Sequence, residues 1–308
     1  MKRNLSPIVL FVYNRLSHTK KTIEALKNNE LAILSDLIIY SDGPKNEEKN
    51  SIVQVNEVRN YLNNINGFKS IKIIKQKKNE GLAKSIISGV SNTVNLYGKV
   101  IVLEDDIVTS KYFLRFMNES LSFYEANHNI YGVTGYAYPI NSKKLPSTFF
   151  LKDEGCWGWG TWDRAWLNFE KNPKKLIKSF DKKMIYDFNF NDSTNIWIQV
   201  IQNSKGIIDT WAVFWYATIF LNNGLFLHPR ESFVKNIGHD FSGTNCIETS
   251  DYDVDLLEVY DIKFNDVIVE SSMARDLHIQ YFNSLKISIF RRLINKIFKI
   301  LNYDRKYN

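Results

Sequence analysis

Cysteine is scarce in this sequence, which contains only Cys156 and Cys246. Two cysteines are too few for a disulfide framework and lack the paired spacing of a zinc site, so we expect a reducing compartment.

Long apolar runs are missing as well. No stretch approaches the roughly 18 to 20 apolar residues that a membrane-crossing helix needs, which argues against a transmembrane segment. The apolar run 8–13 follows a proline and has no small-residue cleavage site, so it predicts a strand and not a signal peptide.

The sequence has ample material for a folded core. Its 308 residues are 44% hydrophobic and 14% aromatic, enough for one large domain or two closely packed ones. Four apolar runs alternate with three amphipathic segments of helical length: 8–13, 17–28, 37–40, 47–62, 71–74, 82–96 and 100–103. Ser17 is in position to cap the first of these helices. Strands separated by such helices indicate right-handed crossovers and a largely parallel sheet covered on both faces.

Polar residues follow each of the four predicted strands. They are Asn14-Arg15, Ser41-Asp42-Gly43-Pro44, Asn79-Glu80-Gly81 and Glu104-Asp105-Asp106. Any one of these groups could be a simple turn or cap. In a parallel sheet, however, the carboxyl ends of the strands meet at one edge, and ligands bind there. Four polar groups on the same edge therefore predict a binding site.

This order of motifs resembles the nucleotide-sugar half of the GT-A glycosyltransferases, in particular N-acetylglucosaminyltransferase I and the family-2-type bacterial surface-polysaccharide transferases. In that group an acidic triplet follows a valine-rich strand and precedes an apolar helix, which would be 107–121 here. The resemblance continues through 131–135 and 155–160 and covers about residues 7–245. It implies an α/β fold with a Rossmann-like, mostly parallel central sheet flanked by helices.

The resemblance also implies a division of the chain. Residues 1–140 would form the nucleotide-sugar half and residues 141–284 an α+β acceptor-binding half of the same domain. The segment 285–308 has seven Lys and Arg against one Asp, and its apolar residues share one half of a helical wheel. That pattern is typical of an amphipathic helix on an anionic membrane surface, although a helix docked on the protein or on a dimer partner shares it. Nucleic acid is not an expected partner.

The acidic triplet has a chemical rationale. Departure of a nucleoside diphosphate from a sugar leaves extra negative charge, which a bridging divalent cation stabilises. Mn²⁺ or Mg²⁺ prefers carboxylate oxygens and water as ligands. By resemblance, Asp106 would be the metal ligand and Asp105 would approach the ribose or the donor sugar. Glu104 would contact the sugar hydroxyls as part of the catalytic group. Acids that stabilise a helix N-terminus are the structural alternative.

The resemblance assigns roles to other loops as well. Asp42 would accept hydrogen bonds from the base or ribose, Arg15 would lie near the uracil or diphosphate, and Asn79 near the base or sugar. Further on, residues 234–244 resemble the Asn-Ile-Gly loop that closes over the pyrophosphate in the bacterial enzymes. His239 in this loop would contact phosphate oxygens. Alternatively, it would be a third metal ligand or a simple turn residue.

The acceptor half contains a loop rich in glycine and tryptophan, 155–162. Glycines allow close backbone approach, and tryptophan faces can stack on a sugar. Trp157 and Trp159 are predicted to line the sugar pocket, in line with the Gly-x-Gly-Trp loop of the resembled enzymes. Trp162 and Trp166 are predicted to belong to the core.

An inverting transfer needs a base that takes the proton of the acceptor hydroxyl. In the resembled enzymes this base is an aspartate in an Asp-Trp context after the glycine-tryptophan loop, and the nearest match is Ile-Ile-Asp-Thr-Trp at 207–211. Asp209 is therefore the predicted base, with the register open by one residue toward Thr210. Asp153 and Glu154, just ahead of the loop, are the alternatives.

The sequence thus predicts a metal-dependent, inverting glycosyltransferase that uses a nucleotide sugar, with UDP implied by the resemblance. Its acceptor would be a lipid-linked or surface glycan such as O-antigen or capsule, and its location the cytoplasmic face of the plasma membrane. A sugar nucleotidyltransferase would use a similar sheet and metal, but residues 13–17 are not the glycine-rich, basic phosphate loop of such enzymes. A catalytically inactive glycan-binding protein on the membrane is the other alternative, and the intact acidic triplet argues against it.

Overall fold

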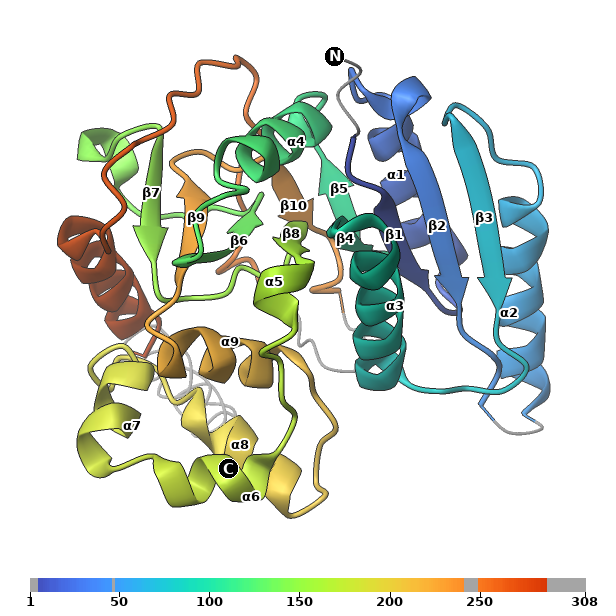
Figure 1. Cartoon of the computed structure of the whole chain (residues 1–308). Helices are drawn as coiled ribbons and strands as arrows, with labels where there is room; N and C mark the ends of the chain where they lie inside the picture. The colour runs from blue at the N-terminus through green and yellow to red at the C-terminus, as the bar shows by residue number, and fades with distance from the viewer. Residues whose placement is uncertain (1–4, 46–47, 241–248, 287–308) are drawn as a thin grey trace, which may run out of the picture.

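The computed structural model describes residues 5–45, 48–240 and 249–286 (Figure 1). Its strands are β1 (Ile8–Val12), β2 (Asp36–Ser41), β3 (Ser70–Lys75), β4 (Lys99–Glu104), β5 (Ile107–Thr109), β6 (Ile130–Thr134), β7 (Thr148–Leu151), β8 (Trp159–Trp162), β9 (Leu225–Pro229) and β10 (Val234–Asn236). Its helices are α1 (Leu16–Lys27), α2 (Lys49–Leu62), α3 (Leu82–Tyr97), α4 (Phe113–Phe123), α5 (Asp163–Trp166), α6 (Pro173–Ser179), α7 (Lys182–Phe188), α8 (Trp197–Ser204) and α9 (Ala212–Leu221), with 3-10 turns at Ala32–Leu34 and Ser142–Lys144. Residues 272–286 are also helical.

A sheet of eight strands organises the described residues, in the order β3-β2-β1-β4-β8-β6-β9-β7. The strands β3, β2, β1 and β4 run parallel to one another. β8 is antiparallel to its neighbours β4 and β6, and β7 is antiparallel to β9. β5 and β10 form a separate antiparallel ladder. The predicted α/β class, with a central sheet flanked by helices, is confirmed. The predicted halves 1–140 and 141–284 both contribute strands to this sheet, and the division itself stays a prediction.

Helices cover both faces of the sheet, as the alternation of strands and helices predicts. On one face α1, α2 and α4 pack against side chains such as Leu10 and Ile101. On the other face α3, α5 and α9 pack against Val9, Val102 and a group of tryptophans. Neighbouring residues of one strand thus point to opposite faces, as the pleat requires. A third apolar cluster joins α6 to α9 with the helix 272–286, below the sheet in Figure 1.

The elements predicted before residue 105 are confirmed, with small shifts at their ends, as β1 to β4 and α1 to α3. Two details are wrong. The helix predicted over 107–121 is replaced at its start by β5, because these residues pair with β10 far along the chain, and α4 begins only at Phe113. Ser17 lies inside α1, whose N-cap residue is Arg15.

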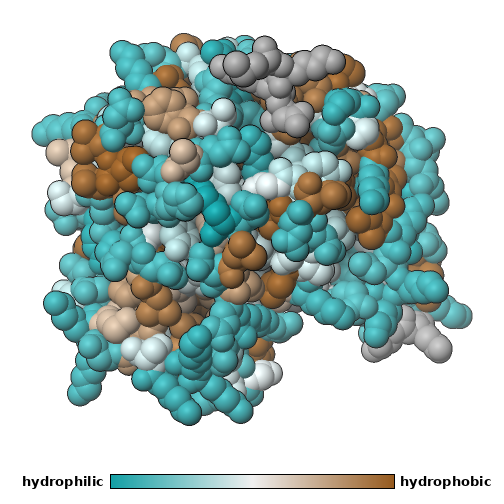
Figure 2. All heavy atoms as spheres, in the orientation of Figure 1, coloured by the Kyte–Doolittle hydropathy of each residue, from teal (hydrophilic) through white to brown (hydrophobic). Residues whose placement is uncertain are grey.

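The carboxyl ends of β1 to β3 point toward the lower edge of the molecule in Figure 1, and β4 runs parallel to β1. The space-filling view is indented along this edge, between the part that contains α6 to α9 and the part that contains β1 to β3 (Figure 2). The loops after the parallel strands therefore lie at a hollow of the surface, as the position of ligand sites in such sheets leads one to expect.

Among the described residues, no helix combines the length and the apolar character required to cross a bilayer. The amphipathic helix predicted for 285–308 lies outside the described residues apart from its beginning, which continues the helix 272–286.

Candidate active site

The acidic triplet lies in the middle of the carboxyl edge of the sheet. Glu104 is the last residue of β4, which is hydrogen-bonded to β1 on one side and to β8 on the other. Asp105 and Asp106 form the turn between β4 and β5, and both are buried. Because a strand follows them, they are not the first turn of a helix, and the capping alternative is wrong.

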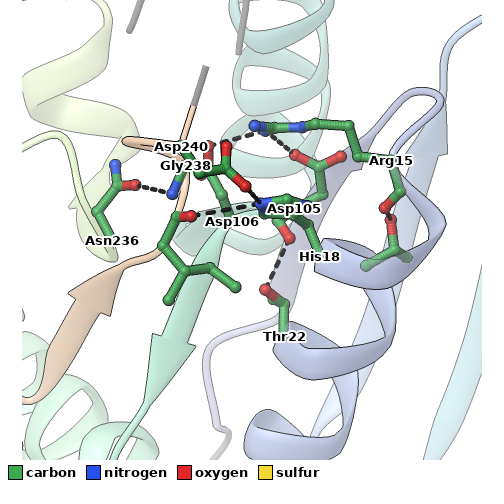
Figure 3. Close-up of polar contacts among 10 residues, drawn as sticks. Arg15, His18, Thr22, Asp105, Asp106, Asn236, Gly238 and Asp240 are labelled. Carbon is green, nitrogen blue, oxygen red and sulfur yellow. Dashed lines mark hydrogen bonds and ion pairs between the residues drawn. The ribbon is translucent and has the colours of Figure 1, made fainter. Parts of the chain in front are cut away.

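Arg15 supplies the positive charge that this turn requires. It is the N-cap residue of α1, and its Nη2 donates to an oxygen of Asp105 and, at 2.8 Å, to Oδ2 of Asp106 (Figure 3). Two turns further along the helix, the hydroxyl of Thr22 donates to the main-chain oxygen of Asp105 at 2.8 Å. Burial disfavours the charge on Arg15, but the two carboxylates outweigh that effect and raise its pKa above the usual value. Arg15 and the triplet thus share the predicted edge of the sheet and form a direct ion pair, whereas the place of Arg15 beside a uracil or diphosphate stays a prediction.

The carboxyl groups of Glu104 and Asp105 bind a proton with different strength. Burial, together with the charges of Asp106 and Asp105, raises the pKa of Glu104 to about 8. Burial also raises the pKa of Asp105, to about 6, although Arg15 opposes the shift. Glu104 therefore binds its proton more tightly than Asp105 does, and in its protonated form it can donate a hydrogen bond.

The last residue of β10 and the four residues after it form a turn, 236–240. This turn lies against Asp106, which together with Asp105 is called the acidic pair below. The main-chain N–H of Ile237 donates to the carbonyl oxygen of Asp106 at 2.9 Å, which extends the β5–β10 ladder by one bond. The side chain of Asn236 accepts from the N–H of Gly238 at 2.7 Å. A Cβ atom on Gly238 would lie 2.2 Å from Oδ2 of Asp106, so only glycine permits this close approach.

His239 connects this turn to an aromatic group from the second half of the chain. Its ring stacks on Tyr252, with 5.4 Å between ring centroids, and meets the edge of Trp157 at the same separation. Trp157 also packs edge-on against Tyr136. Trp157 is partly exposed, so its predicted role in holding a sugar is compatible with its position.

The oxygen and nitrogen atoms at this edge are suitable ligands for a divalent cation that is shared with a substrate. Oδ2 of Asp105 and both ring nitrogens of His239 are buried and have no hydrogen-bond partner among the described residues. Carboxylate oxygen and imidazole nitrogen are suitable ligands for Mn²⁺. Within the described part of the chain, no three His, Cys, Asp or Glu side chains are grouped so as to hold a metal by themselves. One or two protein ligands suffice where phosphate oxygens and water complete the coordination.

Asp42 and Asn79 hold their own loops together. The carboxylate of Asp42 accepts from the N–H groups of Gly43 and Glu80, both at 2.8 Å, and of Gly81 at 3.1 Å. The side-chain amide of Asn79 donates to the carbonyl oxygen of Gly43 at 3.0 Å. Both residues lie at the predicted edge, but the bonds observed join the loops after β2 and β3 to each other. Their direct contact with a nucleotide stays a prediction.

Trp159 lies in the core and not in a sugar pocket. It is 1% exposed, and its ring stacks on Trp211 with 5.2 Å between centroids. It faces the α3 side of the sheet because it alternates with its neighbours along β8, so the sugar contact predicted for it is corrected to a packing role. Trp162 and Trp166 are buried too, as predicted, but they belong to clusters on opposite faces of the sheet.

Asp209 lies in the loop between α8 and α9. Its side chain is 71% exposed and forms an ion pair with Lys171. The two residues line an open pocket of about 470 Å³, together with Asn203 and Gly206. Trp211, two residues further on, stacks on Trp159, the first residue of β8, which lies toward the carboxyl edge of the sheet. Asp209 is therefore accessible to a large substrate.

Asp153 and Glu154, the alternative bases, are neighbours in the loop between β7 and β8, where Asp153 is buried and Glu154 is partly exposed. Their carboxyl groups hydrogen-bond each other, and burial raises the pKa of Asp153 to about 7 and that of Glu154 well above its usual value. Both lie close enough to Cys156 to raise its pKa, as does Glu104. The pair therefore binds a proton more tightly than two exposed carboxyl groups would.

Several residues of this site were not among those predicted from the sequence. His18 contacts the turn 236–240, Tyr252 stacks on His239, and Arg59 donates to the main-chain oxygens of Asp42 and Gln76 at 3.1 and 2.6 Å. His18 could have been found from its place one helical turn after Arg15. The others come from distant segments whose meeting depends on the tertiary fold.

The sequence matches no protein-family model and no curated protein. The structure is similar to that of GalNAc-T7 crystallised with UDP, GalNAc and Mn²⁺, with 10% sequence identity and a TM-score of 0.45, over 75% of this chain and 43% of that chain. It is also similar to S. aureus TarS 1-349 in complex with UDP-GlcNAc, with 10% identity and a TM-score of 0.39, over 75% of this chain and 57% of that chain. The chain thus spans about half the length of these solved structures.

Proposed function

We propose that this protein transfers a sugar from a nucleoside diphosphate donor to a hydroxyl group of a glycan. One observation carries the proposal: the acidic triplet at the carboxyl ends of the parallel strands is bonded to Arg15 and covered by the turn 236–240. Such a site offers carboxylate oxygens for a cation that a diphosphate would share, and hydrogen-bonding carboxyl groups for a sugar. Uridine diphosphate is the nucleotide that the sequence resemblance implies.

On the donor side, several polar atoms are free to receive a ligand. Nη1 of Arg15 is buried without a partner among the described residues, as is Oδ2 of Asp105. Nη1 is suited to an oxygen of the base or the diphosphate, and Oδ2 to a ribose or sugar hydroxyl. Glu104, whose pKa is raised by burial, can in its protonated form both donate to and accept from a sugar hydroxyl.

Asp106, the metal ligand that the sequence resemblance implies, and His239, whose ring nitrogens have no partner among the described residues, would hold Mn²⁺ or Mg²⁺ together with oxygens of the donor diphosphate. The cation would neutralise the charge that develops on the diphosphate as it leaves. Trp157, beside His239, would present its ring to the donor sugar.

The acceptor side must remove one proton. In an inverting transfer, the acceptor oxygen forms a bond to the anomeric carbon while the bond from that carbon to the diphosphate breaks, and the hydroxyl proton passes to a base. We assign this base to Asp209, whose exposed carboxylate lines an open pocket and is oriented by Lys171. The Asp153–Glu154 pair is the second candidate.

A donor panel tests the proposed function directly. Purified protein is incubated with uridine, guanosine or thymidine diphosphate sugars and Mn²⁺, and both binding and slow release of the diphosphate are measured. We expect binding and hydrolysis with a uridine donor. Binding by Asp106→Asn should be weakened, and its hydrolysis lost. If no nucleotide sugar binds to the wild-type protein, the proposed function is wrong.

We also propose that the acceptor is a lipid-linked or surface glycan and that the protein works at the cytoplasmic face of the plasma membrane. The support is the basic and apolar composition of 285–308. Removal of the residues after Leu285 should release the protein from vesicles of anionic lipid but leave donor hydrolysis intact. Sedimentation with anionic and with neutral vesicles checks this, and equal binding by the full and shortened chains would contradict it.

A further inference from the structure

The first turns of α1 present a row of polar side chains to the donor site. Arg15, His18 and Thr22 are spaced three and four residues apart, so they share one face of the helix. Arg15 and Thr22 bind the acidic pair, as described above. His18 lies between them and is 9% exposed. Its contacts reach a different segment of the chain.

His18 binds the turn 236–240 from the side of α1 (Figure 3). Its Nε2 lies 3.3 Å from the carbonyl oxygen of Ile237 and 3.1 Å from Oδ2 of Asp240. A carbonyl oxygen and a carboxylate oxygen can only accept, so Nε2 carries the hydrogen and donates it between the two. One imidazole thus joins two points of a turn that is more than two hundred residues away in sequence.

The same turn is attached at two other places. Its start is bonded to Asp106 through the N–H of Ile237, and Gly238 lies against the carboxylate of Asp106. Its His239 ring packs on Trp157 and Tyr252 from the second half of the chain. The turn therefore bridges α1, the acidic pair and the aromatic group, with His18 as its bond to α1.

The strands that lead to this turn give it limited support. β5 and β10 have three residues each and form a ladder separate from the large sheet. Ile107 and Val234 hold this ladder in the core beside α1, but the ladder ends at Asn236 and includes only the first residue of the turn. The position of the turn over Asp106 must therefore depend on bonds made beyond the ladder, and the contact with His18 is one of them.

We propose that His18 is a positioning residue that fastens the turn 236–240 to α1 and so fixes His239 and Asp106 relative to Arg15. This inference rests on the proposed function, because it assigns to the turn the task of holding the diphosphate end of the donor. His18 touches neither donor nor acceptor in this scheme. It acts through the turn.

Three variants test the proposal: His18→Ala, His18→Gln and His128→Ala. Glutamine can place an amide N–H close to the position of Nε2, so it keeps a donor for Ile237 and Asp240. His128 is an exposed histidine between α4 and β6 and is the matched control. Hydrogen exchange of the segment 234–240 is measured for each protein, together with its affinity for UDP in the presence of Mn²⁺.

We expect His18→Ala to speed the exchange of the N–H groups of Ile237 and Gly238 about tenfold and to weaken UDP binding by a similar factor, since a hydrogen bond involving a carboxylate is lost. His18→Gln should recover most of both losses, and His128→Ala should match the wild type. Unchanged exchange in β1 (Ile8–Val12) shows that each variant is folded.

The two readouts separate this inference from the proposed function. If exchange of the turn is the same in His18→Ala and in the wild type, or if His18→Gln behaves like His18→Ala, the positioning role is wrong whatever the protein binds. If exchange rises as expected but the wild type binds no nucleotide, the contact holds the turn, and both the proposed function and the role of His18 in donor binding are wrong.

Discussion

The two sides of the candidate site differ in how completely the protein satisfies its own charges. On the proposed donor side, Asp105 and Asp106 are buried and bonded to Arg15. On the proposed acceptor side, Asp209 is largely exposed and pairs with Lys171 at the surface. Buried charges need a fixed partner, whereas an exposed pair contributes little to stability and can exchange its partner readily. Under the proposed function, the donor site would be built in advance and the acceptor site would be completed by its substrate.

The loops around the two sides follow the same contrast. Arg59, Asp42 and Asn79 tie the loops after β2 and β3 through hydrogen bonds to main-chain atoms. The Asp209 loop forms the wall of an open pocket. A preformed donor site lowers the entropy that must be lost when a small, flexible nucleotide sugar binds. An open acceptor side suits a larger and more variable glycan.

The largest effect is expected from the donor side. Asp106→Asn removes a charge that both Arg15 and a metal would use, and turnover of every donor should fall about a thousandfold or more. Asp276→Asn, an exposed aspartate on the helix 272–286, is the control. Initial rates with the best donor of the panel measure the effect, and a change of less than about tenfold would remove Asp106 from the metal site.

The acceptor side decides between two bases. If Asp209 takes the proton, Asp209→Asn should lower the transfer rate about a hundredfold to ten-thousandfold and leave UDP affinity unchanged. Glu154→Gln should then change the rate little. The opposite result would move the base to the pair Asp153–Glu154. Single-turnover rates and UDP titrations of both variants, measured side by side, make this distinction.

Replacement of the two tryptophans of the glycine-rich loop should have different effects, one on stability and the other on binding. Trp159→Ala empties a core position and should lower the free energy of unfolding by about 3 to 5 kcal/mol. Trp157→Ala should cost less stability but weaken donor-sugar binding about tenfold through the lost ring contact. Urea unfolding and nucleotide-sugar titration of both variants measure the difference. Equal losses of stability would show that Trp157 too belongs to the core.

The smallest effect concerns pH. Burial raises the pKa of Asp153 to about 7 in the folded protein, against about 4 for an exposed aspartate. The folded state thus binds this proton more tightly than the unfolded chain, so the free energy of unfolding falls as pH rises from about 4 to about 7. In Asp153→Asn the fall between pH 5 and pH 8 should be smaller, by on the order of 1 kcal/mol. Urea midpoints at both pH values check this, and equal falls would contradict it.

The sequence was sufficient for the local elements of the first half. Its apolar runs and amphipathic segments have different periods, and each period selects strand or helix through side-chain burial. The same logic placed Arg15 and the acidic triplet on one edge, because parallel strands bring their carboxyl ends together. It failed at 107–121, where an apolar composition fits both a helix and a short buried strand. Pairing with β10 decided in favour of the strand.

The sequence by itself determined the core pattern, the position of the carboxylates at the end of β4 and the kind of chemistry they suit. Only the tertiary structure decided that Trp159 is a core residue and that the turn 236–240 lies on Asp106 with His18 at its side. The reason is physical. Periodicity records which side chains are buried within one element, whereas a contact between segments far apart in sequence depends on how the sheet and helices pack together.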